Sequence, residues 1–263
     1  MNINFSKYQG AGNDFVLIDH RVNTLKNIDN KLVAQLCDRR FGIGGDGLML
    51  LLDHPDYDFE MVYYNADGNV GSMCGNGGRC IVAFAKQLGV IESETTFLAV
   101  DGPHYAKISA AGDFVSLQMI DVETVNRDGE DYVINTGSPH YVKFETAAIT
   151  DKDVFTEGRA IRYNETYKGE GININFVEDK EDHLFVRTYE RGVEDETFAC
   201  GTGVTAVALA DAVAKGKRGT IQTPIKVLGG ELNIHFNYDG KQFTQIFLEG
   251  PAVKVFKGEI LLA

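Results

Sequence analysis

Two short glycine-rich segments with one cysteine each constrain this chain more than any other feature. Met73–Gly77 reads Met-Cys-Gly-Asn-Gly, and Ala199–Gly203 reads Ala-Cys-Gly-Thr-Gly. An apolar run follows each segment, over residues 80–88 and 204–214. Glycine allows a tight turn, and a long apolar run after a turn is typical of a buried helix. We therefore expect two matching loops, each leading into a buried helix.

The likeness between the two parts of the chain extends beyond these loops. Cys74 and Cys200 are 126 positions apart. Asn13, in a glycine-rich turn near the start, and Ser138, in a similar turn, are 125 positions apart. A second match at nearly the same offset indicates an internal duplication. We predict two pseudo-symmetric lobes, each with strands wrapped around a central helix.

The predicted fold class is α+β, with a lobe boundary near residue 120. The first lobe covers residues 1–120 and the second covers 121–250, while residues 251–263 are expected to return to the first lobe. A helix over residues 29–38 is expected to have Asp29 as its N-cap, and a hairpin is expected at residues 238–241. More short strands should follow residue 214. Predicted strands before it cover residues 3–8, 14–19, 48–52, 58–64, 95–101, 104–109, 113–118, 131–135, 140–145, 172–178 and 183–189.

Composition excludes several classes of partner. The 263 residues carry a net charge of −13, which argues against nucleic acids and anionic membranes, because both need a basic surface. No apolar run approaches the ~20 residues that a membrane-spanning helix needs. The first residues lack the pattern of a signal peptide, so we expect a cytoplasmic protein. A small anionic substrate remains compatible with this charge, since a site can be locally positive.

The four cysteines fall into two kinds. No Cys-x-x-Cys pair is present, which argues against a zinc site, and a reducing compartment argues against a structural disulfide. Cys37 and Cys80 lie in apolar helical patterns and are interpreted as buried small residues. Cys74 and Cys200 stand where helices begin. There, amide groups and the helix dipole lower the pKa of a thiol and attract anions such as carboxylates.

Two such thiols suit one reaction. If two helix starts face each other across a cleft, one thiolate can remove the α-proton of an amino acid while the other thiol returns a proton to the opposite face. The helix amides would hold the carboxylate and the charge that develops on it. This chemistry needs neither metal nor cofactor. The alternatives are a Cys–His hydrolase using His140, which leaves the second thiol loop unexplained, and a dithiol redox protein.

These segments closely resemble the diaminopimelate epimerase family over essentially the whole chain. The family's fold implies two similar lobes, each a β-barrel-like mixed sheet around a central helix, with the active site in the cleft. Its activity implies conversion of LL- to meso-diaminopimelate in lysine and peptidoglycan precursor synthesis, without pyridoxal phosphate, and a homodimer. The resemblance rests on residues 12–15, 41–47, 64–68, 73–77, 137–140, 190–192 and 199–203.

The resemblance also implies roles for individual residues. Cys74 and Cys200 match the two acid/base residues, and the other matches concern binding. Glu190 and Arg191 match the pair that holds the substrate's amino and distal carboxylate groups, as a bidentate arginine can. His140 is implied to position substrate and tune the thiols, together with Glu190, and Ser138 precedes it in the same motif. The implied substrate contacts are Asn13, Asn65, Gly75, Asn76, Asn173, Gly201 and Thr202.

This chain departs from the family pattern at two contacts and in one segment. Ser138 stands where members often have Asn, Gly47 stands where some have Gln, and residues 193–197 are longer and more acidic than expected. The related proline racemase group is an alternative, but proline has no distal charge for Arg191 to hold. Phenazine-biosynthesis relatives use no cysteine pair. A non-catalytic amino-acid-binding or redox-sensing protein is the alternative from another class.

Overall fold

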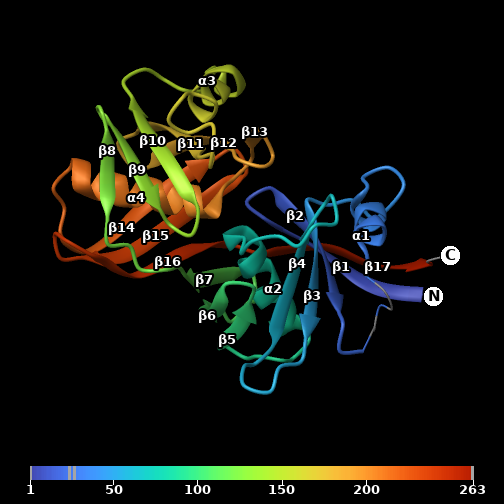
Figure 1. The fold of residues 1–263 in the computed structure, drawn as a ribbon. Helices are drawn as coiled ribbons and strands as arrows, with labels where there is room; N and C mark the ends of the chain where they lie inside the picture. Colours follow the sequence, from blue (N-terminus) through green and yellow to red (C-terminus); the bar gives the residue numbers. More distant parts are fainter. Residues whose placement is uncertain (1, 23–24, 26–27, 262–263) are drawn as a thin grey trace. The chain divides into compact units, whose positions relative to one another are not determined.

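The structure, a computed structural model, describes residues 2–22, 25 and 28–261 (Figure 1). Backbone contacts divide the chain into two compact units. Unit 1 comprises Met1–Leu117 and Gly250–Ala263, and unit 2 comprises Gln118–Glu249. Strands in parallel and antiparallel pairings combine with helices in both units, which confirms the predicted α+β class.

Unit 1 begins with a hairpin and recruits the end of the chain as a further strand. The turn between β1 and β2 is tight because Ala11 and Gly12 both have positive φ, 52° and 84°. β1 also pairs antiparallel with β17, from Asn2 opposite Leu261 onward. The elements are β1 (Asn2–Gly10), β2 (Asn13–Asp19), α1 (Asn30–Cys37), β3 (Gly47–Leu52), β4 (Glu60–Asn65), α2 (Gly75–Gln87), β5 (Glu94–Ala99), β6 (Gly102–Ile108), β7 (Phe114–Gln118) and β17 (Val253–Leu261).

Helices pack on both faces of β3, which explains its unbroken apolar sequence. Successive side chains of a strand point to opposite faces. Leu48 and Leu50 join the core cluster that contains Val33 and Leu36 of α1. Between them, Met49 points the other way, and its terminal methyl lies against Gly77 of α2. A strand that is covered on both faces needs apolar residues at every position, not an alternating pattern.

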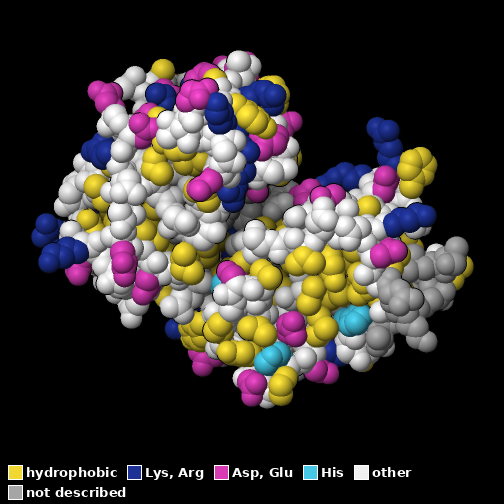
Figure 2. Space-filling view, viewed as in Figure 1, with side chains coloured by type: hydrophobic (Ala, Val, Ile, Leu, Met, Phe, Trp, Pro, Cys, Tyr) yellow, Lys and Arg dark blue, Asp and Glu magenta, His cyan; other side chains and the backbone are white. Residues whose placement is uncertain are grey.

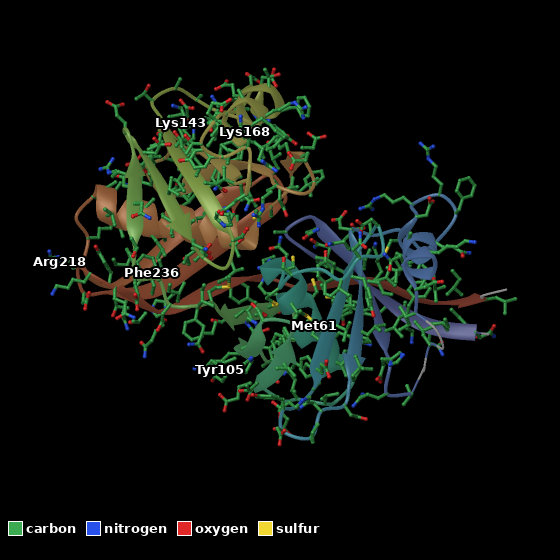
Figure 3. All side chains as sticks on the ribbon, viewed as in Figure 1. Met61, Tyr105, Lys143, Lys168, Arg218 and Phe236 are labelled. Atoms are coloured by element: carbon green, nitrogen blue, oxygen red, sulfur yellow. The ribbon has the colours of Figure 1, made fainter. Side chains whose placement is uncertain are left out.

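Unit 2 surrounds its long helix with strands. α4 packs against β9, β10, β11, β14 and β15. Phe236 of β15, which is labelled in Figure 3, contacts Phe243 of β16 edge to face, with ring centroids 5.6 Å apart. The elements are β8 (Val125–Asp128), β9 (Asp131–Asn135), β10 (Pro139–Glu145), α3 (Val154–Arg162), β11 (Asn173–Asp179), β12 (Leu184–Glu190), β13 (Asp195–Thr197), α4 (Gly201–Ala214), β14 (Gly219–Val227), β15 (Gly230–Tyr238) and β16 (Phe243–Pro251).

The two long helices end in the same way. At the end of α2, the amides of Gly89 and Val90 donate to the carbonyls of Lys86 and Ala85, and Gly89 has a φ of 72°. At the end of α4, Gly216 has a φ of 61°, and its amide and the next one donate to the corresponding carbonyls. This glycine-terminated motif satisfies carbonyls that a helix end leaves open. Both predicted helix ends are therefore confirmed.

The expectation that Cys74 and Cys200 stand where helices begin is confirmed, but the apolar runs placed the helix starts almost a turn or more too late. α2 begins at Gly75, not Cys80, and α4 begins at Gly201, not Val204. Glycine disfavours helix, so the apolar run alone indicated a later start. Close neighbours explain why glycine stands in these early turns. A side chain at Gly203 would collide with Asn175, and one at Gly78 with Met73.

Two further expectations about the fold are confirmed, one helix was missed, and the late strands are longer than expected. The N-cap is confirmed, because the Asp29 carboxylate accepts from the amide of Leu32 at 2.8 Å. The hairpin at residues 238–241 joins β15 to β16 as predicted. Helix α3 was missed, although Asp153 caps it by accepting from Thr156. The late strands were expected to be short, yet β14 to β17 have nine residues each, because long partners pair along their whole length.

The surface shows no single charged region in the view of Figure 2, where acidic and basic side chains are interspersed. Within the described residues, no helix is both long and apolar enough to cross a membrane.

Candidate active site

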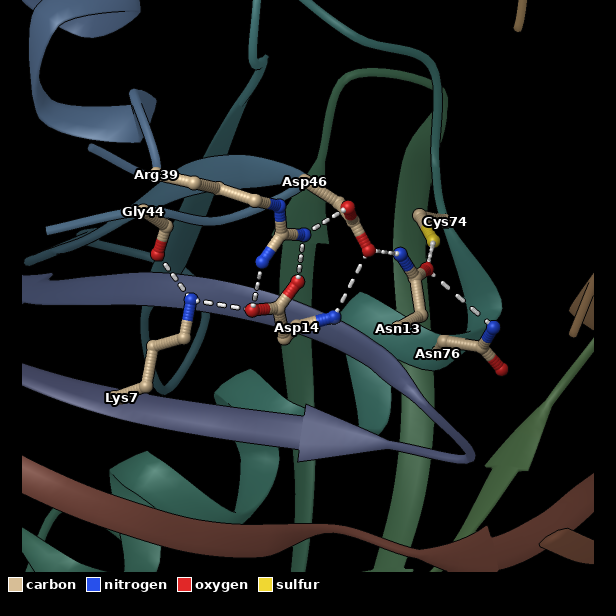
Figure 4. Close-up of polar contacts among 8 residues, drawn as sticks. All are labelled: Lys7, Asn13, Asp14, Arg39, Gly44, Asp46, Cys74 and Asn76. Atoms are coloured by element: carbon tan, nitrogen blue, oxygen red, sulfur yellow. Dashed lines mark hydrogen bonds and ion pairs between the residues drawn. The ribbon is translucent and has the colours of Figure 1, made fainter. Parts of the chain in front are cut away.

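Cys74 is the N-cap residue of α2. It lies in extended backbone conformation, and its carbonyl accepts the first helical hydrogen bond, from Gly78 at 2.7 Å. Its thiol does not cap the helix but donates to Asn13 Oδ1 at 3.7 Å. Asn76 Nδ2 donates to the same oxygen at 3.4 Å (Figure 4). The first half-site thus brings together Cys74, Asn13 and Asn76, three of the predicted site residues.

A cluster of paired charges holds Asn13 in place. Its Nδ2 donates to Asp46 Oδ2 at 2.5 Å, and because a carboxylate only accepts, the Asn13 carbonyl must face Cys74. Arg39 bridges Asp46 and Asp14, with contacts of 2.7 and 2.6 Å. Lys7 Nζ lies 2.6 Å from Asp14. Burial opposes ionisation of Asp14, but hydrogen bonds from Arg39 and Lys7 prevail and lower its pKa to about 2.

Cys200 is the N-cap residue of α4 and has different neighbours. Its carbonyl accepts from Val204 at 2.9 Å, and its sulfur lies 3.5 Å from Thr202 Oγ1. The Thr202 hydroxyl lies 2.9 Å from His140 Nε2. The second half-site therefore joins three predicted residues in a chain: Cys200, Thr202 and His140.

Asn175 decides the tautomer of His140. Its Nδ2 donates to the Tyr141 carbonyl at 3.0 Å, and its Oδ1 accepts from Thr188, so Nδ2 also faces His140 Nδ1 at 3.2 Å. His140 Nδ1 is then an acceptor and Nε2 carries the proton that goes to Thr202. Burial, with a contribution from Arg191, lowers the pKa of His140 to about 3. The imidazole is therefore neutral near pH 7. Because the Thr202 oxygen accepts from His140, the Thr202 hydroxyl proton points toward the Cys200 sulfur.

Asn173 links Ser138 to Arg191. Its Nδ2 donates to Ser138 Oγ at 3.0 Å, and its Oδ1 accepts from the Arg191 amide at 2.8 Å. The Arg191 guanidinium donates to the Glu170 carbonyl and to Ser138 Oγ, at 3.1 and 3.3 Å. In the described part of the chain, both acceptors of this guanidinium are uncharged, so it keeps its positive charge available. The Ser138 hydroxyl, which stands where the resemblance implied an asparagine amide, accepts hydrogen bonds from the Asn173 and Arg191 side chains.

Glu190 ends β12 and accepts from the Thr197 hydroxyl at 2.9 Å. The acidic segment that follows has structural contacts of its own. Glu196 forms a two-point contact with Arg187 at 2.6 and 2.7 Å. Glu194 accepts from the hydroxyl groups of Tyr163 and Tyr189. The extra acidic residues therefore anchor this turn within unit 2.

Asn65 and Gly47 are paired at the end of β4 and the start of β3. Asn65 is exposed, and its side-chain oxygen lies near Gly71, before Cys74. A side chain at position 47 would collide with the ring of Tyr63 and the carbonyl of Tyr64. This crowding gives a physical reason for Gly47, because a glutamine there would have to displace one of them.

The remaining cysteines are buried, as predicted. Cys37 is 3% exposed and Cys80 is fully buried, and burial raises their pKa values to about 11 and about 12. All four cysteines lie in the described ranges, and none forms a disulfide.

Comparison with known proteins places this chain. The sequence model of the family described as diaminopimelate epimerase matches residues 5–125 and 132–255. This chain belongs to the diaminopimelate epimerase family. The two matched segments are separated by residues 126–131. This gap lies between the two parts of the chain that the internal repeat relates, one with Cys74 and the other with Cys200.

Several family relatives are similar over nearly their full length. The diaminopimelate epimerase of Flavobacterium psychrophilum is 52% identical over 97% of this chain and 98% of its own. Those of Chlorobaculum tepidum and Aquifex aeolicus are 42% and 39% identical, over 96% and 97% of this chain and 99% and 97% of theirs.

Solved structures share the fold at low sequence identity. A Bacillus anthracis protein of the PhzF family has a TM-score of 0.73 at 14% identity, covering all of both chains. A probable proline racemase from Agrobacterium radiobacter has a TM-score of 0.71 at 16% identity, covering 99% of this chain and 93% of its own. These two likenesses concern the fold alone.

Sequence reasoning missed three residues of these half-sites. Asp46 orients Asn13, Asn175 orients His140, and Arg79 donates to Asn76 Oδ1 at 3.1 Å. Only Asp46 gave a signal, since it lies in the glycine-rich segment that the resemblance included. Asn175 occupies a strand and Arg79 a helix, where polar residues usually face solvent.

Proposed function

We propose that this protein epimerises LL-diaminopimelate to meso-diaminopimelate through the two thiols Cys74 and Cys200. The observation that carries the proposal is the duplicated arrangement, in which each cysteine is the N-cap of a buried helix in a family named for this activity. One sulfur, as thiolate, takes the α-proton and becomes a thiol. The other thiol gives its proton to the opposite face of the carbon and becomes a thiolate, so the configuration inverts.

The groups around each thiol fit the charges of this reaction. We assign the α-carboxylate to the amides at the starts of α2 and α4, those of Gly75, Asn76, Gly201 and Thr202, because helix N-termini attract anions. Amides placed there also stabilise the negative charge that develops on the carboxylate as the proton leaves. No electron acceptor is needed, since one proton is removed and one is added.

The distal end of the substrate is assigned to Arg191 and Glu190. A guanidinium whose described acceptors are uncharged can take a carboxylate in a two-point contact. Glu190 can pair with an ammonium group. We also assign contacts with the substrate to Asn13, Asn65 and Asn173, although Asn173 is almost fully engaged with its protein neighbours. The cytoplasmic location and the homodimer stay predictions, and light scattering in solution tests the latter.

Proton exchange tests the reaction and the substrate together. NMR in D₂O with reduced protein and LL-diaminopimelate should show the meso isomer with deuterium at one α-carbon, and L-proline in a parallel tube should not exchange. Exchange with proline alone would move the protein to the racemase relatives. No exchange with either would favour a binding or sensing role.

Single cysteine variants test the two-base mechanism. We expect Cys74→Ala and Cys200→Ala each to lower epimerisation by at least about a hundredfold, since positioned acid/base groups commonly contribute on the order of 10²–10⁴ each and both are needed. Cys37→Ala is the matched control, because that thiol lies in the α1 core cluster. Normal turnover in either of the first two variants would rule the mechanism out.

A further inference from the structure

Arg162, the last residue of α3, is largely buried although it is a cation. Helix α3 packs against β11, β12 and β13 (Figure 1). The Arg162 side chain is 12% exposed, and its Nε is buried without a hydrogen-bond partner among the described residues. Its other nitrogens reach the Tyr167 carbonyl at 3.5 Å and Glu194 Oε1 at 3.3 Å. Buried polar groups are normally well paired, so a loosely paired guanidinium indicates a role other than the stability of α3.

Gly171 brings Arg162 next to Arg191. A side chain at Gly171 would meet the guanidinium carbon of Arg162 at 2.6 Å and Cδ of Arg191 at 2.7 Å. The two arginines thus approach the same point from different segments, and glycine leaves the space that they fill. Two like charges this close favour a nearby anion. Among the described contacts, the carboxylate of Glu194 pairs with Arg162 and not with Arg191.

Both carboxylate oxygens of Glu194 are engaged. Oε2 accepts from the hydroxyl groups of Tyr163 and Tyr189 at 3.0 and 3.1 Å. Oε1 accepts from the amide of Gly192 at 3.1 Å and faces Arg162. Glu194 has a φ of 58°, a left-handed conformation that costs free energy in a residue other than glycine. These four contacts offset that cost, and they fix the carboxylate on the side of α3.

Without these partners, Glu194 would compete for Arg191. The two residues are three positions apart in one turn, which the Glu194 amide closes by donating to the Glu190 carbonyl at 2.8 Å. A carboxylate of the protein on the Arg191 guanidinium would occupy the donors that a substrate carboxylate needs. The other glutamate of this acidic segment is also held elsewhere, because Glu196 forms its two-point contact with Arg187.

We propose, resting on the proposed function, that Arg162 is a positioning residue for the distal carboxylate of the substrate. It holds Glu194 against α3, and so keeps the Arg191 guanidinium available for that carboxylate. Arg162 acts through Glu194 and does not itself contact the substrate. Its own charge, beside the stem of Arg191, adds to the positive field that attracts an anion to this place.

Substrate affinity tests the proposal. Arg162→Met releases Glu194, so KM for diaminopimelate should rise by about tenfold or more while kcat changes far less, since this contact lies at the distal end of the substrate. Arg162→Lys keeps the charge and should show a smaller rise. An equal rise in Arg162→Lys, or none in Arg162→Met, would overturn the proposal.

Arg159→Met is the matched control and should leave KM unchanged. Arg159 is an exposed residue of the same helix, and its guanidinium lies 4.8 Å from the centre of the Tyr163 ring, against 4.7 Å for Arg162. The control therefore removes a cation from the same ring but leaves the ion pair with Glu194 in place. The same rise in KM in this variant would refute a specific role for Arg162.

A second substitution separates positioning from a general structural role. Arg162→Met combined with Glu194→Gln removes the charge that competes for Arg191, so KM should return to within about threefold of the wild type. Damage to the fold would persist or grow in the double variant. No recovery of KM would therefore refute the role assigned to Arg162.

Arginine modification reports the same change without substrate. Phenylglyoxal reacts with accessible guanidinium groups, and a paired carboxylate slows the reaction. Peptide mass spectrometry should show slower modification of Arg191 in Arg162→Met than in the wild type, with recovery in the double variant. Equal rates in all three proteins would overturn the proposal.

Two further outcomes stay distinguishable. If Arg162→Met does not fold, Arg162→Gln gives the same comparison, because its amide can still donate to the Tyr167 carbonyl. If the wild type shows no proton exchange with diaminopimelate, the proposed function fails, while the modification rates still decide whether Arg162 controls the pairing of Arg191.

Discussion

The role of His140 is set by the residues that it contacts and not by the acid/base chemistry of its imidazole. Its sequence context suggested a base or a tuner of the thiols. In the structure it is fully buried, it accepts from Asn175, and it donates to Thr202. A neutral imidazole held in one tautomer cannot serve as a proton store near pH 7. Its contribution is to orient the Thr202 hydroxyl toward Cys200.

The burial of His140 predicts a pH dependence of stability. Its pKa is about 3 in the folded protein and about 6.5 when unfolded. Between these values the unfolded chain binds the additional proton, so the stability is fully present above about pH 6.5 and falls by ~1.4 kcal/mol per pH unit below it. From about pH 7 to about pH 5, the wild type should lose ~2 kcal/mol more than His140→Asn in urea unfolding. Equal losses in the two proteins would contradict this view.

At the scale of the element, the two N-caps show what the glycines are for. Gly77 and Gly203 stand three residues after the two cysteines. A side chain at Gly77 would meet the flexible end of Met49, whereas one at Gly203 would meet Asn175 Oδ1. Asn175 cannot move away without breaking its bonds to Thr188 and Tyr141. A glycine at this position is therefore needed more strictly in α4 than in α2.

This difference predicts unequal effects of one substitution. Gly77→Ala should change the free energy of unfolding by less than ~1.5 kcal/mol, because better helix propensity offsets the displacement of Met49. Gly203→Ala should cost about 1–3 kcal/mol more, through the lost hydrogen bonds of Asn175. Calorimetry of the two variants gives the comparison, and equal melting temperatures would show that Asn175 is not held as described.

At the scale of the whole molecule, the chain closes unit 1 with its last strand. β17 pairs with β1 along its length, while β1 pairs with β2 on its other side. Unit 1 is therefore discontinuous in sequence, and unit 2 is one continuous segment. Residues from both ends of the chain must meet before unit 1 can be complete.

Deletion of residues 253–263 should affect the two units differently. Without β17, β1 becomes an unpaired edge, and its backbone groups lose their partners. Hydrogen exchange followed by mass spectrometry should show lost protection in β1 and β2, with β11 and α4 of unit 2 serving as the internal control. Equal loss of protection in both units would show that they do not respond separately.

The sequence by itself determined the features that depend on neighbouring residues. The duplicated cysteine loops, the glycine ends of α2 and α4, the Asp29 cap and most strands follow from local hydrogen bonding and side-chain periodicity. Tertiary structure decided the rest. The helices start at Gly75 and Gly201 despite the poor helix propensity of glycine, and in the first turn of α4 the neighbouring Asn175 leaves no room for a side chain at Gly203. The roles of Asp46, Asn175 and Arg79 arise from partners that the fold brings together, as with His140 and Thr202, 62 positions apart. Local sequence cannot encode such contacts, because packing between distant segments sets which polar groups must satisfy one another.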